Sequence, residues 1–589
     1  MNILRFLTTI LILYISTAAN AQFNFQRSWG TYFGDERFDF SDSKVDRSGN
    51  LYIVGSIYGL NLTNLPLFTN SSSHQQNYGG GDNDGFIVKF NPQGNIVWGT
   101  FFGGFSSDRI EAIEIDNNDN LYIIGETLSN SNIATTGSFQ ENLNGGGDNF
   151  ISKFSSSGAI IWSTYFGGSG IDFAAYTGKI SFDGVNSIYI SSKIFSPDMA
   201  TPNVFQETIG TNQISKFDLN GNRIWTTYYG INDIMDLKAS SFGIFVTGKT
   251  LDCPPIHSYN TYYGTPNTFK PLPENCVEIF LSKFNSIGQR TWSTYYGGDK
   301  SETVSKNNSL DLNNDKIFIA GMSPNYNNEE VATSGTYQSN CFGTSSFIAN
   351  FNQDSTRNWG TYNGNYNISN QQLLPINSSV KTIKNKNSFY NYGTTNIPSN
   401  IATSDGYLST LNNENVCDAY FCKFTDQNTK SWGTYYGGEL EEKNVRFHSH
   451  DDESQFYIVG STQSLTQIAS PNGLQPNKQV FDLVSNTQQS AYSIFIAHFV
   501  PNALSNENFT NSSFSIFPNP NNGEFIVKLN SVDFVQTSLQ IFDMLGKLIY
   551  NQNLNSNQTT IYTKYIEKGV YLVKLTRGNQ TTTSKIVVN

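Results

Sequence analysis

Short apolar runs alternate with polar turns along most of the chain. Around residues 110–166, a first run ends in the turn 117–120 and a second run follows at 121–125. After a longer loop, a third run stands at 150–154 and a fourth at 160–166. Runs of this length, rich in Ile, Phe, Tyr and Thr and bounded by Asn, Gly and Ser, are typical of β-strands. The pattern therefore predicts units of four short antiparallel strands.

A tryptophan-centred motif, W-x-T-[YF]-x-G, recurs at a regular interval. All seven tryptophans of the chain fall in it: Trp29, Trp98, Trp162, Trp225, Trp292, Trp359 and Trp432. Successive tryptophans are separated by 69, 64, 63, 67, 67 and 73 residues. Each interval holds one four-strand unit, and radial repetition of such units is typical of a β-propeller. Seven copies predict seven blades.

The two ends of the repeat region fit together. The chain opens with a fourth-strand motif at 23–34, and no earlier strands exist for it to pair with. It closes on a blade at 444–499 that has its first three strands and then runs into a polar stretch. An unpaired strand would leave backbone donors and acceptors exposed beside buried aromatic side chains. We therefore expect segment 23–34 to complete blade seven and to close a propeller spanning residues 22–503.

The repeat has the pattern D-x-x-x-N-x-Y-I-x-G, followed by F-I-x-K-F-x-x-x-G-x-x-x-W-x-T-Y-Y-G-G. This pattern resembles the seven-bladed β-propeller (SBBP) repeat family, and the resemblance covers residues 23 to about 503. Copies six and four depart most, since Asn363 replaces an aromatic residue and Gly230 lacks a following glycine. The resemblance implies a scaffold and specifies no reaction.

A second domain follows the repeats. Residues 504–511 are polar and predict a linker, and the apolar runs of 512–589 alternate with turn residues. This alternation favours a small antiparallel sandwich. The predicted fold class is therefore all-β, a seven-bladed β-propeller followed by a small C-terminal β-sandwich.

Four elements occur in order in this C-terminal domain: F-x-I-F-P-N-P-x-x-G, D-x-x-G-K, K-G-x-Y-x-V and K-I-V-V. Their marker residues are Pro518, Asn519, Pro520, Gly523, Asp543, Gly546, Lys547, Gly569, Tyr571 and Lys585. The order is similar to the type A C-terminal sorting domain of type IX secretion. The resemblance implies that the type IX machinery is a partner, that the protein crosses the outer membrane, and that the domain is then removed.

The first residues also predict export. Arg5 precedes an apolar run at 6–15, and small residues then lead to Ala21 and Gln22. This is typical of a secretory signal peptide, here 1–21, cleaved between Ala21 and Gln22, and the run is too short to span a membrane. We expect no later transmembrane span. The predicted localisation is secreted or at the cell surface, reached through the periplasm and the outer membrane.

Five cysteines are expected to meet an oxidising environment. Cys253 and Cys276 flank one loop-rich insertion and are predicted to form a disulfide, with Cys417 and Cys422 as the alternative pair. The odd number leaves one thiol unassigned. No C-x-x-C pair suggests a zinc site.

The charge balance narrows the range of partners. The chain has 36 basic and 48 acidic residues, a formal net charge of −12, and the charges are dispersed. An acidic surface repels phosphate backbones, so nucleic acid is not expected as a partner. Dispersed charge is typical of a solubilising surface. We expect the protein to be monomeric.

The candidate metal ligands are His448, His450 and Asp451. Residues two apart on a strand share a face, and a nearby carboxylate could complete a metal site. Aligned with the repeat, however, the two histidines take the apolar positions of Ile113 and Ile115, and Asp451 takes the position of a turn aspartate. This alignment predicts imidazoles packed between strands. We therefore expect no metal and no other cofactor.

No catalytic residues are assigned, because the chain shows no G-x-S-x-G elbow and no phosphate-binding loop. Propellers gather their loops around one axis, where binding sites commonly lie. We therefore expect a non-catalytic binding protein for an extracellular glycan or protein. The alternative is a secreted hydrolase or lyase acting on extracellular polymers, which would need carboxylates or histidines gathered on one face.

Overall fold

The computed structural model describes residues 23–589 apart from 60–67, 173–176, 231, 251–260, 275–276, 299–300, 307, 325–328, 342, 365–376, 480–490, 503–513, 530–536, 545, 564–565 and 578–579. The predicted signal peptide with Ala21 and Gln22, the pair Cys253 and Cys276, and the linker 504–511 lie outside the described residues. The chain divides into two compact units, one ending at Pro501 and one beginning at Asn502.

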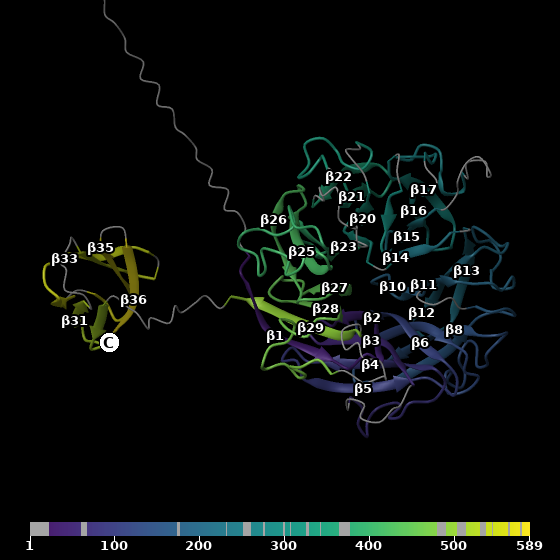
Figure 1. Cartoon of the computed structure of the whole chain (residues 1–589), viewed down its shortest axis with the longest axis horizontal. Helices are drawn as coiled ribbons and strands as arrows, with labels where there is room; N and C mark the ends of the chain where they lie inside the picture. Colours follow the sequence, from purple (N-terminus) through teal and green to yellow (C-terminus); the bar gives the residue numbers. More distant parts are fainter. Residues whose placement is uncertain are drawn as a thin grey trace, which may run out of the picture. The chain divides into compact units, whose positions relative to one another are not determined.

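The first unit is a β-propeller. Within its described residues, strands form seven antiparallel sheets, each a blade whose first strand lies nearest the centre and whose last strand lies at the periphery (Figure 1). Blade one holds β2 (Phe38–Val45), β3 (Leu51–Tyr58), β4 (Asn83–Phe90) and β5 (Ile96–Phe102). Blade two holds β6 (Asp108–Ile115), β7 (Leu121–Thr127), β8 (Asp148–Phe154) and β9 (Ile160–Phe166). Blade three holds β10 (Lys179–Phe182), β11 (Ser187–Lys193), β12 (Asn212–Asp218) and β13 (Arg223–Tyr229).

The remaining blades follow the same order. Blade four holds β14 (Ile234–Ser240), β15 (Gly243–Lys249), β16 (Ile279–Phe284) and β17 (Arg290–Tyr296), with the short 3-10 helix η1 (Thr261–Tyr263) between β15 and β16. Blade five holds β18 (Thr303–Val304), β19 (Leu310–Asn313), β20 (Lys316–Ser323), β21 (Ser345–Asn352) and β22 (Arg357–Asn363). Blade six holds β23 (Asn377–Thr382), β24 (Ser388–Thr395), β25 (Asp418–Thr425) and β26 (Lys430–Tyr436).

Blade seven is built from both ends of the first unit. It holds β27 (Glu442–Ser449), β28 (Phe456–Thr462), β29 (Ser493–Pro501) and β1 (Phe25–Phe33). β1 pairs antiparallel with β29, so that Trp29 lies opposite His498 and Phe33 opposite Ile494. The N-terminal strand is thereby the outer strand of the last blade, and no blade sheet is left without its fourth strand.

The core lies between the blades. Every residue of β4, and nearly every residue of β3, is buried, because each sheet packs between two others. One buried cluster joins Tyr52 and Trp98 of blade one to Ile113 and Phe150 of blade two. Strands buried on both faces explain why the apolar runs of the sequence are continuous rather than alternating.

The second unit is a small β-sandwich of two antiparallel sheets. One contains β30 (Phe514–Phe517), β31 (Glu524–Leu529) and β34 (Gln558–Tyr562); the other contains β33 (Leu548–Leu554), β32 (Thr537–Phe542), β35 (Gly569–Arg577) and β36 (Gln580–Val588). Their inner faces share one apolar core that includes Phe525, Val527, Leu539 and Val573. The alternating burial of β32 fits a strand with one face inward.

Candidate functional site

The first strands of the blades place a ring of mostly polar side chains around the propeller axis. Its members in blade order are Lys44, Glu114, Ser181, Lys238, Asp311, Lys381 and His448. Each pairs across its sheet with an aromatic residue of the second strand, as Lys44 does with Tyr52. These equivalent register positions define what we call the axial ring.

A second layer lies two residues before the axial ring on the same strands. It includes the charged residues Asp42, Lys179, Asp236 and Arg446, and all four are buried. Arg446 binds Asp42 at 3.0 Å, an ion pair that links blade seven to blade one. Buried charges that are paired in this way cost far less free energy than unpaired ones. This layer forms a buried, charged floor next to the axial ring.

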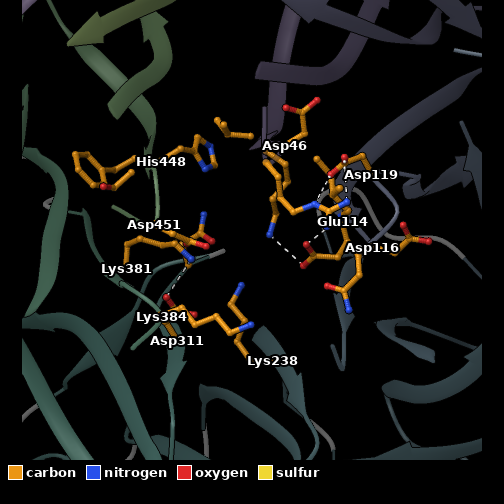
Figure 2. Close-up of a pocket in the computed structure, with 18 of the residues that line it drawn as sticks. Asp46, Glu114, Asp116, Asp119, Lys238, Asp311, Lys381, Lys384, His448 and Asp451 are labelled. Atoms are coloured by element: carbon orange, nitrogen blue, oxygen red, sulfur yellow. Dashed lines mark hydrogen bonds and ion pairs between the residues drawn. The ribbon is translucent and has the colours of Figure 1, made fainter. Parts of the chain in front are cut away.

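Two adjoining cavities open above this floor, with volumes of about 310 Å³ and 540 Å³. Both are lined by Lys44, Glu114, Lys238, Asp311 and Lys381 of the axial ring. Figure 2 shows Glu114, Lys238, Asp311 and Lys381 around one of them. Because they share these walls, we treat them as one site, the axial cavity. Its rim is formed by the turns between the first and second strands, including residues 183–185, 240–242 and 313–314.

The charges of the axial ring are arranged as neighbouring opposite pairs. Lys44 lies 3.0 Å from Glu114, and Lys381 lies 3.4 Å from Asp311. Lys238 reaches down to Asp236 at 3.9 Å. Burial would raise the pKa of Asp311, but Lys381 and Lys238 outweigh burial and hold that pKa below its usual range. Asp311 is therefore a carboxylate at neutral pH, and it accepts hydrogen bonds from the backbone and hydroxyl of Thr382 at 2.8 and 3.0 Å.

His448 is, with Ser181, one of the two uncharged members of the ring. Burial, and after it the charges of Lys44, Lys381 and Arg446, hold the pKa of His448 well below its usual range. Its Nε2 is 2.8 Å from the hydroxyl of Ser43 on the neighbouring blade. His448 thus presents an uncharged imidazole to the cavity at physiological pH.

The expected position of His448 in the repeat was wrong by one residue. His448 pairs with Tyr457, and this places it with Glu114 and Lys44 on the axial ring rather than in the apolar position of Ile113. The neighbouring position, Phe447, takes the apolar role instead and is buried. The cause is a longer turn between the first and second strands. The backbone hydrogen bond that closes it in blade seven runs from His450 to Gln455, one residue more than the equivalent bond from Asp116 to Asn120 in blade two.

The structure does not bring the three candidate metal ligands together. His448 faces Ser43, whereas His450 sits in the turn and contacts Asp452 through Nδ1 at 2.8 Å. Asp451 lies at the cavity rim (Figure 2). Among the residues that the structure describes, no group of three or more His, Cys, Asp or Glu side chains is placed to hold a metal ion.

The alternative disulfide is excluded by the geometry of one strand. Cys417 immediately precedes β25 and Cys422 lies in its middle, and four intervening residues of extended strand hold them well beyond the roughly 5.5 Å between Cα atoms that a disulfide requires. The thiol of Cys422 instead donates to the carbonyl oxygen of Ile401 at 3.4 Å.

The marker residues of the C-terminal domain form its turns and its closing contact. Asn519, between Pro518 and Pro520, donates to the carbonyl of Lys585 at 2.7 Å and accepts from the backbone N–H of Val587 at 2.9 Å. This side chain therefore ties the first motif to the last strand.

The other markers act locally. Asp543 accepts from the backbone N–H of Lys547 at 2.9 Å across the turn between β32 and β33, where Gly546 has a φ of 83° that favours glycine. Gly523 has a φ of 88° in the turn before β31. The hydroxyl of Tyr571, two residues after Gly569, donates to the carbonyl of Glu567 at 2.7 Å.

Residues 515–589 match the secretion system C-terminal sorting domain. The protein is accordingly delivered by type IX secretion to the cell surface or the extracellular space, and the type IX machinery is a partner of its C-terminal domain. No helix among the described residues is long and apolar enough to cross a membrane.

Several solved structures match the chain weakly and at very low identity. The polysaccharide lyase Uly1 is 8% identical, with a TM-score of 0.35 over 78% of this chain and 90% of that one. The sialidase of Trypanosoma rangeli is 8% identical, with a TM-score of 0.29 over 83% and 85%. PorZ, a surface component of the type IX secretion system of Porphyromonas gingivalis, is 10% identical, with a TM-score of 0.21 over 94% and 82%. No curated protein matches the sequence. These similarities are too weak to indicate an activity.

Proposed function

We propose that this protein is an exported, non-catalytic binding protein that holds an extracellular ligand, a glycan or a protein, in the axial cavity. The observation that supports this most directly is the axial ring itself. Blades far apart in the sequence contribute Lys44, Glu114, Lys238, Asp311 and Lys381 to one solvent-open cavity. A concave site with convergent polar groups is the usual form of a ligand site.

The protonation states favour binding over hydrolysis. A general acid needs a carboxyl whose pKa is raised toward the working pH. Lys381 and Lys238 do the opposite to Asp311, because they keep it ionised. The Nε2 atom of His448 is already in contact with Ser43, which is itself fully buried. These contacts suit fixed hydrogen-bonding groups better than groups that exchange protons with a substrate.

The test is ligand capture by the mature protein and by two matched lysine variants. A glycan array and a pull-down of extracellular proteins identify the ligand, and its affinity is then measured for Lys381→Ala and Lys386→Ala. Lys381 lies on β23 and lines the cavity, whereas Lys386 lies on the turn that follows β23, is exposed and lines neither cavity. We expect Lys381→Ala to weaken binding about tenfold or more and Lys386→Ala to leave it unchanged. Equal affinities would remove the axial cavity as the site, and turnover of the captured ligand would favour the hydrolase or lyase alternative.

A further inference from the structure

The charges of the axial ring are paired, which constrains the charge of a ligand. Lys44, Lys381 and Lys238 are each within ion-pair distance of one carboxylate, on Glu114, Asp311 and Asp236 respectively. Other charged residues that line the cavity are paired as well: Arg47 with Asp119, Asp46 with Lys89 and Asp116 with Lys153. At the rim, Lys384 and Asp451 (Figure 2), together with Asp183, add charges of both signs. An anion entering the cavity would meet Glu114 and Asp311, and a cation would meet the lysines. A ligand with net charge therefore finds no unmatched partner on the axial ring.

An uncharged hydroxyl group fits the same ring without disturbing it. An ammonium group only donates hydrogen bonds and an ionised carboxylate only accepts them, whereas a hydroxyl does both. Adjacent hydroxyls of one ligand can accept from Lys44 or Lys381 while they donate to Glu114 or Asp311. Such bonds to charged partners are stronger than bonds between neutral groups. The neutral ring members Ser181 and His448 add groups of the same kind.

The rim of the larger cavity adds an apolar surface. Phe242, on the turn between β14 and β15, is 55% exposed, and Val185, on the turn between β10 and β11, is 61% exposed. Both line the cavity of about 540 Å³. A polar floor beneath an exposed aromatic ring suits a ligand that is polar at its edge and apolar on one face, because aromatic side chains pack against such faces. A pyranose ring has this shape, with hydroxyls around its edge and C–H groups on its faces.

From this arrangement we infer that the axial cavity binds an uncharged saccharide unit, with its hydroxyls on the axial ring and one face against Phe242. The inference rests on the proposed function, since it requires the axial cavity to be the binding site. The cavity opens to solvent at its rim, so the unit bound is the end of an extracellular glycan or a free oligosaccharide. A cavity of this size lies within the range of roughly 300–1,000 Å³ that is typical of small-ligand sites.

The first experiment compares neutral with acidic oligosaccharides on the mature protein. We expect neutral sugars to be bound, with an affinity that changes less than about twofold between roughly 50 and 500 mM salt, because no net charge is neutralised. Preference for acidic oligosaccharides, or a tenfold loss of affinity in high salt, would overturn the inference. Failure of every neutral oligosaccharide to bind at millimolar concentration would overturn it as well.

The second experiment separates the saccharide inference from the proposed site. Phe242→Ala is expected to weaken sugar binding about tenfold, while Phe195→Ala, a similarly exposed phenylalanine (52%) that lines neither cavity, is expected to have no effect. Thermal unfolding should be the same for both variants, since both side chains are exposed. Capture of a protein or an acidic ligand that Lys381→Ala abolishes would keep the proposed site and refute the sugar. Sugar binding that neither Lys381→Ala nor Phe242→Ala alters would refute the site and the inference together.

Discussion

Trp29 and Pro92 join the first and last blades of the propeller: the indole Nε1–H of Trp29 donates to the carbonyl oxygen of Pro92 at 2.9 Å. Trp29 lies in β1 of blade seven, and Pro92 lies in the turn after β4 of blade one. The same link joins Trp98 to Ser156, Trp162 to Leu219, Trp225 to Ser286 and Trp292 to Gln353. The blade made from both chain ends is therefore attached to blade one by the same contact that joins blades one to five in succession.

Loss of this link should destabilise the whole propeller. Trp29 is 3% exposed, and its replacement in Trp29→Ala removes a large buried side chain and a hydrogen bond. We expect the free energy of unfolding to fall by about 3–5 kcal/mol, measured by urea denaturation. Ile161→Ala is the control, because Ile161 is 50% exposed on an outer strand, and it should change stability by less than about 1 kcal/mol. Equal midpoints for Trp29→Ala and the wild-type protein would show that the closing contact contributes nothing.

The blades could be predicted because their strands are sandwiched between neighbours. Burial on both faces produces the continuous apolar runs, and the same interblade hydrogen bond of five of the seven tryptophans goes with the regular interval of the motif. The axial ring could not be predicted in the same way. Lys44 and Lys381 are far apart in the sequence and share no motif, and only the closure of the ring brings them to one cavity.

The sequence carries only part of the signal that locates the ring. In each blade the ring residue pairs with the aromatic residue of the second strand, but Glu114 and Tyr122 are 8 positions apart whereas His448 and Tyr457 are 9 positions apart. A fixed count across the hairpin therefore fails in blade seven, because its turn is one residue longer. Turn length varies freely on a surface, whereas register within a buried sheet does not.

The C-terminal domain should be required for export and absent from the mature surface form. Asn519 ties its first motif to β36, so Asn519→Ala should lower the stability of this domain by about 1–3 kcal/mol. We expect the variant to accumulate in the periplasm and the wild-type protein to be recovered outside the cell. The intact mass of the external protein should fall short of the signal-cleaved chain by about the mass of residues 512–589. Full-length protein at the cell surface would refute removal of the domain.

The purified protein should contain no stoichiometric zinc, manganese or iron. The imidazoles of His448 and His450 contact different groups, Ser43 and Asp452, and do not converge. Elemental analysis of the mature protein measures this directly. The idea would fail if one equivalent of metal were present and were lost in His448→Ala but kept in an Asp354→Ala control, whose side chain lies in a remote exposed turn.

A pair of buried carboxyl groups should make stability depend on pH. Asp84 of β4 and Asp108 of β6 meet beneath Gly103, where an added Cβ would lie 2.5 Å from Asp84 Oδ1 and 2.9 Å from Asp108 Oδ2. Burial raises the pKa of Asp84 to about 7. The hydrogen bond from the backbone of Gly79 opposes this shift, and the negative charge of Asp108 adds to it. Burial likewise raises the pKa of Asp108 to about 6. Blades five and seven carry Ser345 and Ser493 at the position equivalent to Asp84, so the site tolerates an uncharged residue.

The sign of the effect follows from proton binding. In the unfolded chain Asp84 titrates near 4, so between about pH 4 and 7 the folded protein binds more protons than the unfolded one. The contribution of Asp84 to stability is therefore full at low pH and is lost as the pH rises through about 7. The loss amounts to about 1.4 kcal/mol for each unit by which the folded and unfolded pKa values differ.

Asp84→Asn removes this loss of stability. We expect its unfolding free energy, relative to wild type, to increase from pH 5 to pH 7 and to level off by pH 8. Asp315→Asn, whose side chain is 65% exposed, is the control and should show no such trend. A constant difference in unfolding free energy between Asp84→Asn and wild type across this range would contradict the prediction. It would mean that Asp84 is ionised at every pH tested and that its pKa is not raised.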